Sequence, residues 1–301
     1  MLFQYLRATV FSCLCCLCLC SRAYATDEVG SKVISATEHV HDSEHGTVGL
    51  IRTYHDASYT ESPCSAMILL GVGTSMSIRD YDKLSTRIAA GSSIVVVIMD
   101  HNEHFFQKTS PEKYARLVNA IRSNISSLVS ICKNQEPLFL IGGHSSSGEA
   151  AIMTLENSLL GVNPDGWVGL DPYDMSPETI GNDAQIKIPS INWGFAKTTC
   201  LVATDKAAKA AFELADPGAR VLYQINNNEN DCKITHCVFS DHGCGIICSS
   251  NEENDWVPTV VARSINLFVN AVAGRIPFDR SHFQLDLENR VRLYMNDEQF
   301  E

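Results

Sequence analysis

The sequence predicts an α/β protein with a mostly parallel, doubly wound sheet that helices cover on both faces. From about residue 46 to residue 274, short β-rich runs alternate with amphipathic stretches, which is typical of repeated strand-helix units. The run "SSIVVVIMD" over 92–100 has the β-branched composition of a buried parallel strand. The chain has 301 residues, 45% of them hydrophobic and 19% charged, which is enough to form one large core. It shows no internal repeat.

The expected elements follow one another along this region. Strands are predicted at "GTVGLIRTYH" (46–55), "SAMILLGVG" (65–73), "SSIVVVIMD" (92–100), "PLFLIGG" (137–143), "GWVGLD" (166–171), "IPSINWGF" (188–195) and "RVLYQINN" (220–227). Helices are predicted over 79–91 with Gly91 at the end, over 111–131 with Ser110 as cap and Pro111 first, and over 148–160, 204–215 and 256–274.

Outside residues 46–274, which are long enough for one catalytic domain, the two ends of the chain have a different composition. Residues 1–25 place Arg7 ahead of a short apolar run and end in Ala23-Tyr24-Ala25, which predicts a signal peptide and entry to the secretory route. A membrane anchor is the alternative, and the run is short for a bilayer crossing. Residues 26–45 are expected to form a loose N-terminal arm, and 275–301 a polar, irregular C-terminal tail.

Charge and cysteine usage narrow the class further. The formal net charge is -12, and it becomes about -14 once the two arginines of the leader are removed, which disfavours a nucleic-acid partner. Seven cysteines remain, enough for up to three disulfides and one thiol in an oxidising compartment: Cys64, Cys132, Cys200, Cys232, Cys237, Cys244 and Cys248. The 232–248 cluster lacks a C-x-x-C pair, so a zinc site is disfavoured and no metal is expected.

The stretch "GGHSSSG" at 142–148 has the pattern of a nucleophile elbow, a strained turn between a strand and a helix. Such a turn needs small residues two positions before and two after the nucleophile. Ser145 meets this demand, with Gly143 before and Ser147 after, whereas Ser146 and Ser147 do not. Ser146 N–H is then the expected oxyanion donor. A serine-rich helix cap without chemistry is the alternative.

Two further strand ends carry residues that complete a catalytic triad. Asp171 stands at the end of the strand "GWVGLD", with Asp174 as the alternative acid and a turn-forming Asp-Pro as the simpler interpretation. His236 lies in the cysteine-rich loop after the strand at 220–227, and His242 is the alternative base. A pairing of Cys237 within 232–248 would hold His236 firmly. The order Ser, Asp, His along the chain is that of the α/β-hydrolase triad.

These residues resemble the chlorophyllase-like branch of the α/β-hydrolases, with platelet-activating-factor acetylhydrolases and polyester hydrolases as cousins. "GHSSSG" is similar to the branch's G-H-S-x-G-G elbow, "VGLDPYD" to "GLDPVDG", and "THCVFSD" to "SHCQFAD". "YDKLSTRIAAGSSIVVVIMDH" is similar to segments of the type "YSQLLQHIASHGFIVVAPQ". The resemblance covers roughly residues 46–273 and implies an α/β-hydrolase fold over 46–274.

The resemblance implies a role for each residue. Ser145 would attack an ester carbonyl, His236 would take its proton, and Asp171 would orient the imidazole. The family's oxyanion loop falls on Val72-Gly73-Thr74, so Thr74 N–H would be the second donor. Three departures from the pattern put the substrate in doubt: the loop lacks its histidine, Ser147 replaces a glycine, and Ser146 stands where chlorophyllases have an arginine.

The function implied is that of a serine carboxylic-ester hydrolase, most closely a chlorophyllase that releases chlorophyllide and phytol without metal or organic cofactor. The expected partner is a small hydrophobic ester, reached through transient contact with a membrane surface. In an organism with complex plastids, the leader would be the first half of a bipartite plastid address. The alternatives are a secreted lipase-like or phospholipase-like acyl esterase and a non-catalytic binding protein of the same fold.

Overall fold

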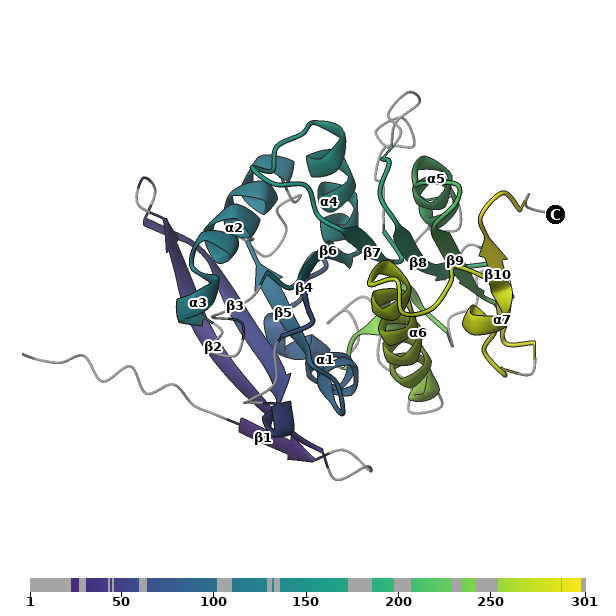
Figure 1. The fold of residues 1–301 in the computed structure, drawn as a ribbon, viewed down its shortest axis with the longest axis horizontal. Helices are drawn as coiled ribbons and strands as arrows, with labels where there is room; N and C mark the ends of the chain where they lie inside the picture. Colours follow the sequence, from purple (N-terminus) through teal and green to yellow (C-terminus); the bar gives the residue numbers. More distant parts are fainter. Residues whose placement is uncertain are drawn as a thin grey trace, which may run out of the picture.

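A computed structural model of the chain contains a ten-stranded sheet (Figure 1). The structure describes residues 23–26, 31–42, 44, 46–59, 64–101, 110–128, 132, 136–172, 186–197, 207–228, 234–241, 254–287 and 289–298. The strands lie in the order β1 (Ala23–Thr26), β2 (Lys32–Asp42), β3 (Gly46–Asp56), β5 (Ile94–Asp100), β4 (Ala66–Gly71), β6 (Leu138–His144), β7 (Gly166–Leu170), β8 (Ser190–Phe195), β9 (Arg220–Ile225) and β10 (Val291–Met295). Neighbours from β5 to β9 run parallel, and the strands at both edges are antiparallel.

Helices pack on both faces of this sheet, so the predicted α/β class with a mostly parallel sheet is confirmed (Figure 1). One core cluster lies under α1 (Asp82–Ala89) and α6 (Trp256–Val272). The other lies under α2 (Pro111–Ser123), α4 (Ser146–Glu156) and part of α5 (Ala207–Leu214). The described residues also form short helices: η1 (Ala57–Tyr59), η2 (Ile78–Tyr81), α3 (Ile125–Leu128), η4 (His236–Phe239) and α7 (Arg280–Phe283).

Two of the predicted helix end signals are present, those at Gly91 and Ser110, whereas the helix predicted over 148–160 spans 146–156. Gly91 has a φ of 66° just after α1, and the Ser110 hydroxyl accepts from Lys113 N–H at 3.3 Å at the start of α2. The helix expected to run to 131 is interrupted at Asn124, and α3 follows it. Asn124 Nδ2 donates to the Ala120 carbonyl at 2.9 Å. A side-chain amide that bonds to a helix carbonyl in this way offers the backbone an alternative to another helical turn.

Residues 32–42 differ from the expected loose arm, because they form β2, which pairs with β3 from Val33 to Asp42 with one irregularity between Val40 and His41. The strand buries Val33 against one core cluster and Val40 against the other. Its charged and histidine-rich end hid these two anchors in the sequence. Beyond the expected tail boundary, β10 pairs with β9, and Phe283 of α7 is fully buried. The sheet therefore extends past both limits predicted for the catalytic region.

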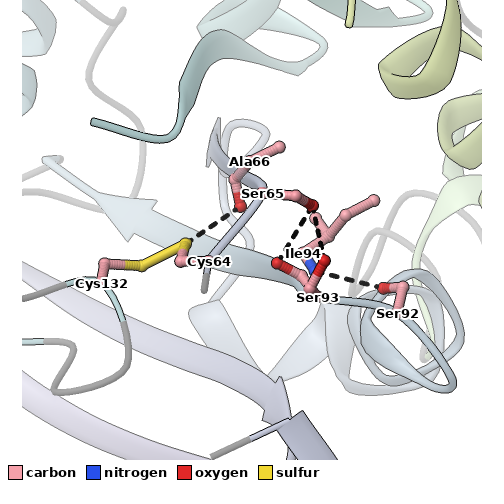
Figure 2. The surroundings of a disulfide bond; sticks show 7 residues. All are labelled: Cys64, Ser65, Ala66, Ser92, Ser93, Ile94 and Cys132. Atoms are coloured by element: carbon pink, nitrogen blue, oxygen red, sulfur yellow. Dashed lines mark hydrogen bonds between the residues drawn. A yellow bond between two sulfur atoms is a disulfide. The ribbon is translucent and has the colours of Figure 1, made fainter. Parts of the chain in front are cut away.

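A disulfide joins Cys64 to Cys132, with a Cα–Cα distance of 5.0 Å (Figure 2). Cys64 lies just before β4, where Ser65 also bonds to Ser93 ahead of β5. Cys132 lies between α3 and β6, so the bond ties the approaches to two adjacent strands together. Cys237 is also disulfide-bonded, to a partner outside the described residues. Disulfides were expected, but the sequence did not indicate the Cys64–Cys132 pair.

Because this disulfide closes a separation of 68 residues, its removal is expected to destabilise the fold. We expect the Cys64→Ala/Cys132→Ala variant to lose about 2–4 kcal/mol of unfolding free energy, measured by denaturant titration. The variant is preferred to a reducing agent, which would also act on Cys237. Cys64→Ala alone is the matched control and should lose a similar amount. An unchanged denaturation midpoint in both would show that the bond contributes no stability.

Candidate active site

Ser145 occupies a sharp turn between β6 and α4. Its backbone angles are φ 56° and ψ −128°, on the left-handed side that a non-glycine residue seldom adopts. Ser145 N–H donates to the Leu170 carbonyl at 3.1 Å, and Gly148 and Glu149 N–H close back onto the Ser145 carbonyl at 2.9 and 3.2 Å. The strand-turn-helix context of a nucleophile elbow is therefore present around this serine.

The turn depends on the close approach of the helix to the strand. A Cβ atom added at Gly143 would lie 2.8 Å from the Cβ of Ser147, and one at Gly148 would lie 2.9 Å from the Cβ of Pro172. Contacts this short do not occur between real side chains. Glycine is thus required at 143 and 148, and the first of these positions is the one that the steric argument from the sequence singled out.

Ser147 stands where the elbow motif would have a glycine, and the space for its side chain is provided by another strand. A Cβ at Gly71 of β4 would lie 2.6 Å from the Ser147 Cβ and 3.1 Å from a ring carbon of Tyr114. The missing side chain at Gly71 leaves this volume to Ser147, which is fully buried and donates a hydrogen bond to the Val72 carbonyl. The substitution at the elbow is thus matched by Gly71.

Asp171 and Ser145 are the first residues beyond two adjacent parallel strands. His144 of β6 pairs with Leu170 of β7, so the residues that follow them stand side by side, about 5 Å apart in the strand-to-strand direction. The Asp171 side chain is fully buried. His236, which starts η4, donates from Nδ1 to Asp171 Oδ2 at 2.6 Å. With its proton on Nδ1, the neutral imidazole presents an unprotonated Nε2 that can accept a proton.

The segment that carries His236 is held at several points. Thr235 accepts from Cys237 N–H at 3.3 Å, and the Ser240 hydroxyl donates to the Cys237 carbonyl at 2.8 Å. Asp241 N–H donates to the Asp80 carbonyl at 2.6 Å. These bonds and the disulfide at Cys237 restrict the backbone on both sides of the imidazole.

The two residues expected to bind an oxyanion also meet at this site. Thr74 Oγ1 and Ser146 Oγ are 2.8 Å apart, so the loop after β4 contacts the start of α4. A Cβ at Gly73 would lie 3.3 Å from the Ser145 Cβ. The Val72-Gly73-Thr74 loop therefore lies against the serine, where backbone donors are needed to stabilise a tetrahedral oxyanion.

Tyr81 and His144 contact this constellation and were not predicted as site residues. Tyr81 Oη accepts from Gly73 N–H at 2.9 Å and lies 2.7 Å from His144 Nδ1. His144 Nε2 lies 3.0 Å from the His236 carbonyl oxygen. Burial lowers the pKa of His144 well below its usual value and raises the pKa of Tyr81. In the sequence, both residues appeared only as members of family-like motifs.

His101 lies just beyond β5 at the same end of the sheet. It is 3% exposed, its ring meets that of Tyr114 edge-on with centroids 5.5 Å apart, and within the described residues neither ring nitrogen has a hydrogen-bond partner. Burial and the charge of Lys113 lower the pKa of His101 to about 4. The imidazole is therefore neutral at physiological pH.

The alternatives Asp174 and His242 both lie outside the described residues. In the described part of the chain, no group of three or more histidine, cysteine, aspartate or glutamate side chains is arranged to hold a metal ion. No described helix is long and apolar enough to cross a membrane.

No protein-family model matches the chain, and no curated protein matches it either. The fold class therefore rests on the structure alone, which is that of an α/β protein whose mostly parallel sheet is compatible with an α/β-hydrolase fold.

The fit between Gly71 and Ser147 can be tested with a double-mutant cycle. We expect Gly71→Ala to lower the unfolding free energy by about 1–3 kcal/mol, because the new methyl group overlaps the Ser147 side chain. Ser147→Gly removes that overlap, so the double variant should be more stable than the sum of the two single changes predicts, measured by denaturant titration. Simple additivity of the two changes would show that the residues are not coupled.

The buried His101 should make stability depend on pH. The pKa in the folded chain, about 4, lies below the unfolded value of 6.5, so the unfolded chain binds more protons between these pH values. The contribution of His101 to the unfolding free energy is therefore most favourable above about pH 6.5 and declines as the pH falls toward 4. We expect His101→Leu to reduce this loss by about 1 kcal/mol per pH unit, measured as unfolding free energy at several pH values. Parallel pH profiles for variant and wild type would refute this.

Proposed function

We propose that the protein is a serine carboxylic-ester hydrolase with Ser145 as nucleophile, His236 as general base and Asp171 as the residue that orients His236. The observation that carries this proposal is the 2.6 Å bond from His236 to a fully buried Asp171, beside a serine held in strained backbone geometry. A serine that merely caps a helix needs neither the strained backbone nor a buried carboxylate in the next strand end that is bonded to an imidazole. The pair fits the base and orienting acid of a triad.

In the proposed acylation step, Ser145 Oγ attacks the ester carbonyl carbon while its proton passes to His236 Nε2. The oxyanion that forms would be bound by the backbone N–H groups of Ser146 and Thr74. Asp171 stabilises the imidazolium that develops. Collapse breaks the bond to the alcohol oxygen, which takes the proton from His236 and leaves.

Deacylation repeats the sequence with water as nucleophile. His236 takes a proton from water, the hydroxide attacks the acyl carbon, and the bond to Ser145 Oγ breaks as the serine regains a proton. The products are a carboxylic acid and an alcohol. No metal or organic cofactor takes part in the proposed cycle.

For the substrate, we propose the phytyl ester of chlorophyll. The support is the set of chlorophyllase-like motifs around the three residues, "GHSSSG", "VGLDPYD" and "THCVFSD". A substrate of this kind partitions into membranes, so the proposal includes transient contact with a membrane surface, after delivery by the secretory route or a bipartite plastid route. The alternative is an acyl ester of lipase or phospholipase type, which the departures at Val72, Ser146 and Ser147 keep open.

A fluorophosphonate probe tests the reaction class. We expect the purified chain to be labelled, with peptide mapping placing the label on Ser145 and Ser145→Ala abolishing it. His236→Ala should abolish turnover, whereas His242→Ala should reduce it little, because His236 holds the bond to Asp171. An unlabelled wild type would favour a non-catalytic binding protein. The reverse result for the two histidines would reassign the base.

The same preparation decides the substrate. Chlorophyll a and a series of acyl esters of increasing chain length are supplied in detergent micelles, and chlorophyllide release is followed by chromatography. Release that requires Ser145 supports the chlorophyllase proposal. Cleavage of short acyl esters without chlorophyllide release would replace it with the acyl-esterase alternative.

A further inference from the structure

The Tyr81 hydroxyl links the loop after β4 to the residue that precedes Ser145. Its oxygen accepts from Gly73 N–H at 2.9 Å and lies 2.7 Å from His144 Nδ1. Tyr81 and His144 are 1% and 0% exposed, so no solvent reaches these groups to take over their bonds. A phenol and an imidazole buried to this degree are tolerated only when their polar atoms are satisfied internally.

The direction of each hydrogen bond follows from the acceptor at the far end of the chain of contacts. The His236 carbonyl oxygen, 3.0 Å from His144 Nε2, can only accept, so Nε2 carries the proton. A neutral His144 then has an unprotonated Nδ1, which accepts from the Tyr81 hydroxyl. The Met76 sulfur, 3.1 Å from the same hydroxyl, is a weak competing acceptor. The chain runs from Gly73 N–H through Tyr81 and His144 to the His236 carbonyl.

We propose that Tyr81 and His144 are positioning residues that hold the oxyanion loop and the backbone of the general base in fixed geometry around Ser145. The inference rests on the proposed esterase function. Neither side chain is assigned contact with the substrate or a proton in the reaction. Their task is to connect three separate segments: the loop at Gly73, the end of β6 and the start of η4.

Ring contacts support the same assignment. The His144 ring lies 4.6 Å from the His236 ring and 5.9 Å from the Tyr81 ring, centroid to centroid. The His236 ring thus packs on the His144 ring, and Nε2 of His144 also bonds to the His236 carbonyl. Displacement of His144 would move His236 relative to Ser145, and misplacements of about 1 Å in a catalytic group reduce rates by about 100-fold.

Tyr81→Phe isolates the hydroxyl, since it keeps the buried ring. We expect the second-order rate of fluorophosphonate labelling, and kcat for a short ester, to fall about tenfold or more, with KM little changed. Tyr223→Phe is the matched control: Tyr223 is also 1% exposed, and its hydroxyl donates to the Phe283 carbonyl at 2.6 Å, away from the site. This control should label at the wild-type rate.

A second pair of variants separates the hydrogen bonds from simple packing. His144→Gln retains an amide that can donate to the His236 carbonyl and accept from Tyr81, whereas His144→Leu can do neither. We expect the Gln variant to be labelled several-fold faster than the Leu variant. Equal rates would assign His144 a packing role and overturn the inference.

The histidine tautomer gives a readout that needs no activity. In ¹⁵N-labelled wild type, His144 should show a protonated Nε2 and an unprotonated Nδ1, unchanged between about pH 5 and about pH 8. The opposite tautomer, or Tyr81→Phe labelling as fast as wild type, overturns the positioning role alone. Equal slowing in Tyr81→Phe and Tyr223→Phe also overturns it. A wild type that never labels removes the proposed function, and this inference with it.

Discussion

The close approach of α4 to β6 is the constraint on which the site depends. It forces Ser145 into backbone angles that residues other than glycine seldom adopt, and it excludes a side chain at position 143. Such strain persists only when the surroundings over-determine it. Here the surroundings are the parallel strands on either side, which place Gly73 against the serine and Asp171 beside it. The sheet therefore sets the geometry of the turn and also places Gly73 and Asp171 next to Ser145.

Polar groups buried next to this turn form one connected set. Asp171 meets His236, and the His236 carbonyl meets His144, whose other nitrogen meets Tyr81. A half-satisfied network of this kind would cost more than an apolar core, because each orphaned group would keep its desolvation penalty. The linkage of these groups by hydrogen bonds offsets the desolvation cost of burying them. It also means that these side chains act together, so the effect of changing one cannot be assigned to that residue alone.

Most strands and helices of the middle region could be predicted, because hydrophobic periodicity and end signals such as Ser110 are local. Within the site, the strand ends carrying Ser145 and Asp171 were predictable for the same reason. The rest depends on long-range contact: Tyr81 and His144 are 63 residues apart, and the bond from His144 to the His236 carbonyl spans 92. Strand β2 was missed because its polar end masks two buried valines, and its stability comes from pairing with its neighbours β1 and β3.

Gly71 and Ser147 together impose an order on sequence change. With any larger residue at 71, a serine at 147 meets an occupied volume, so the glycine on β4 must be present before the serine can enter the elbow. Once Ser147 is present and bonded to the Val72 carbonyl, a larger residue at 71 is excluded until position 147 is glycine again. Two positions that are distant in the chain thus share one packing volume. A library that varies position 71 while Ser147 is kept samples only combinations in which the two side chains overlap.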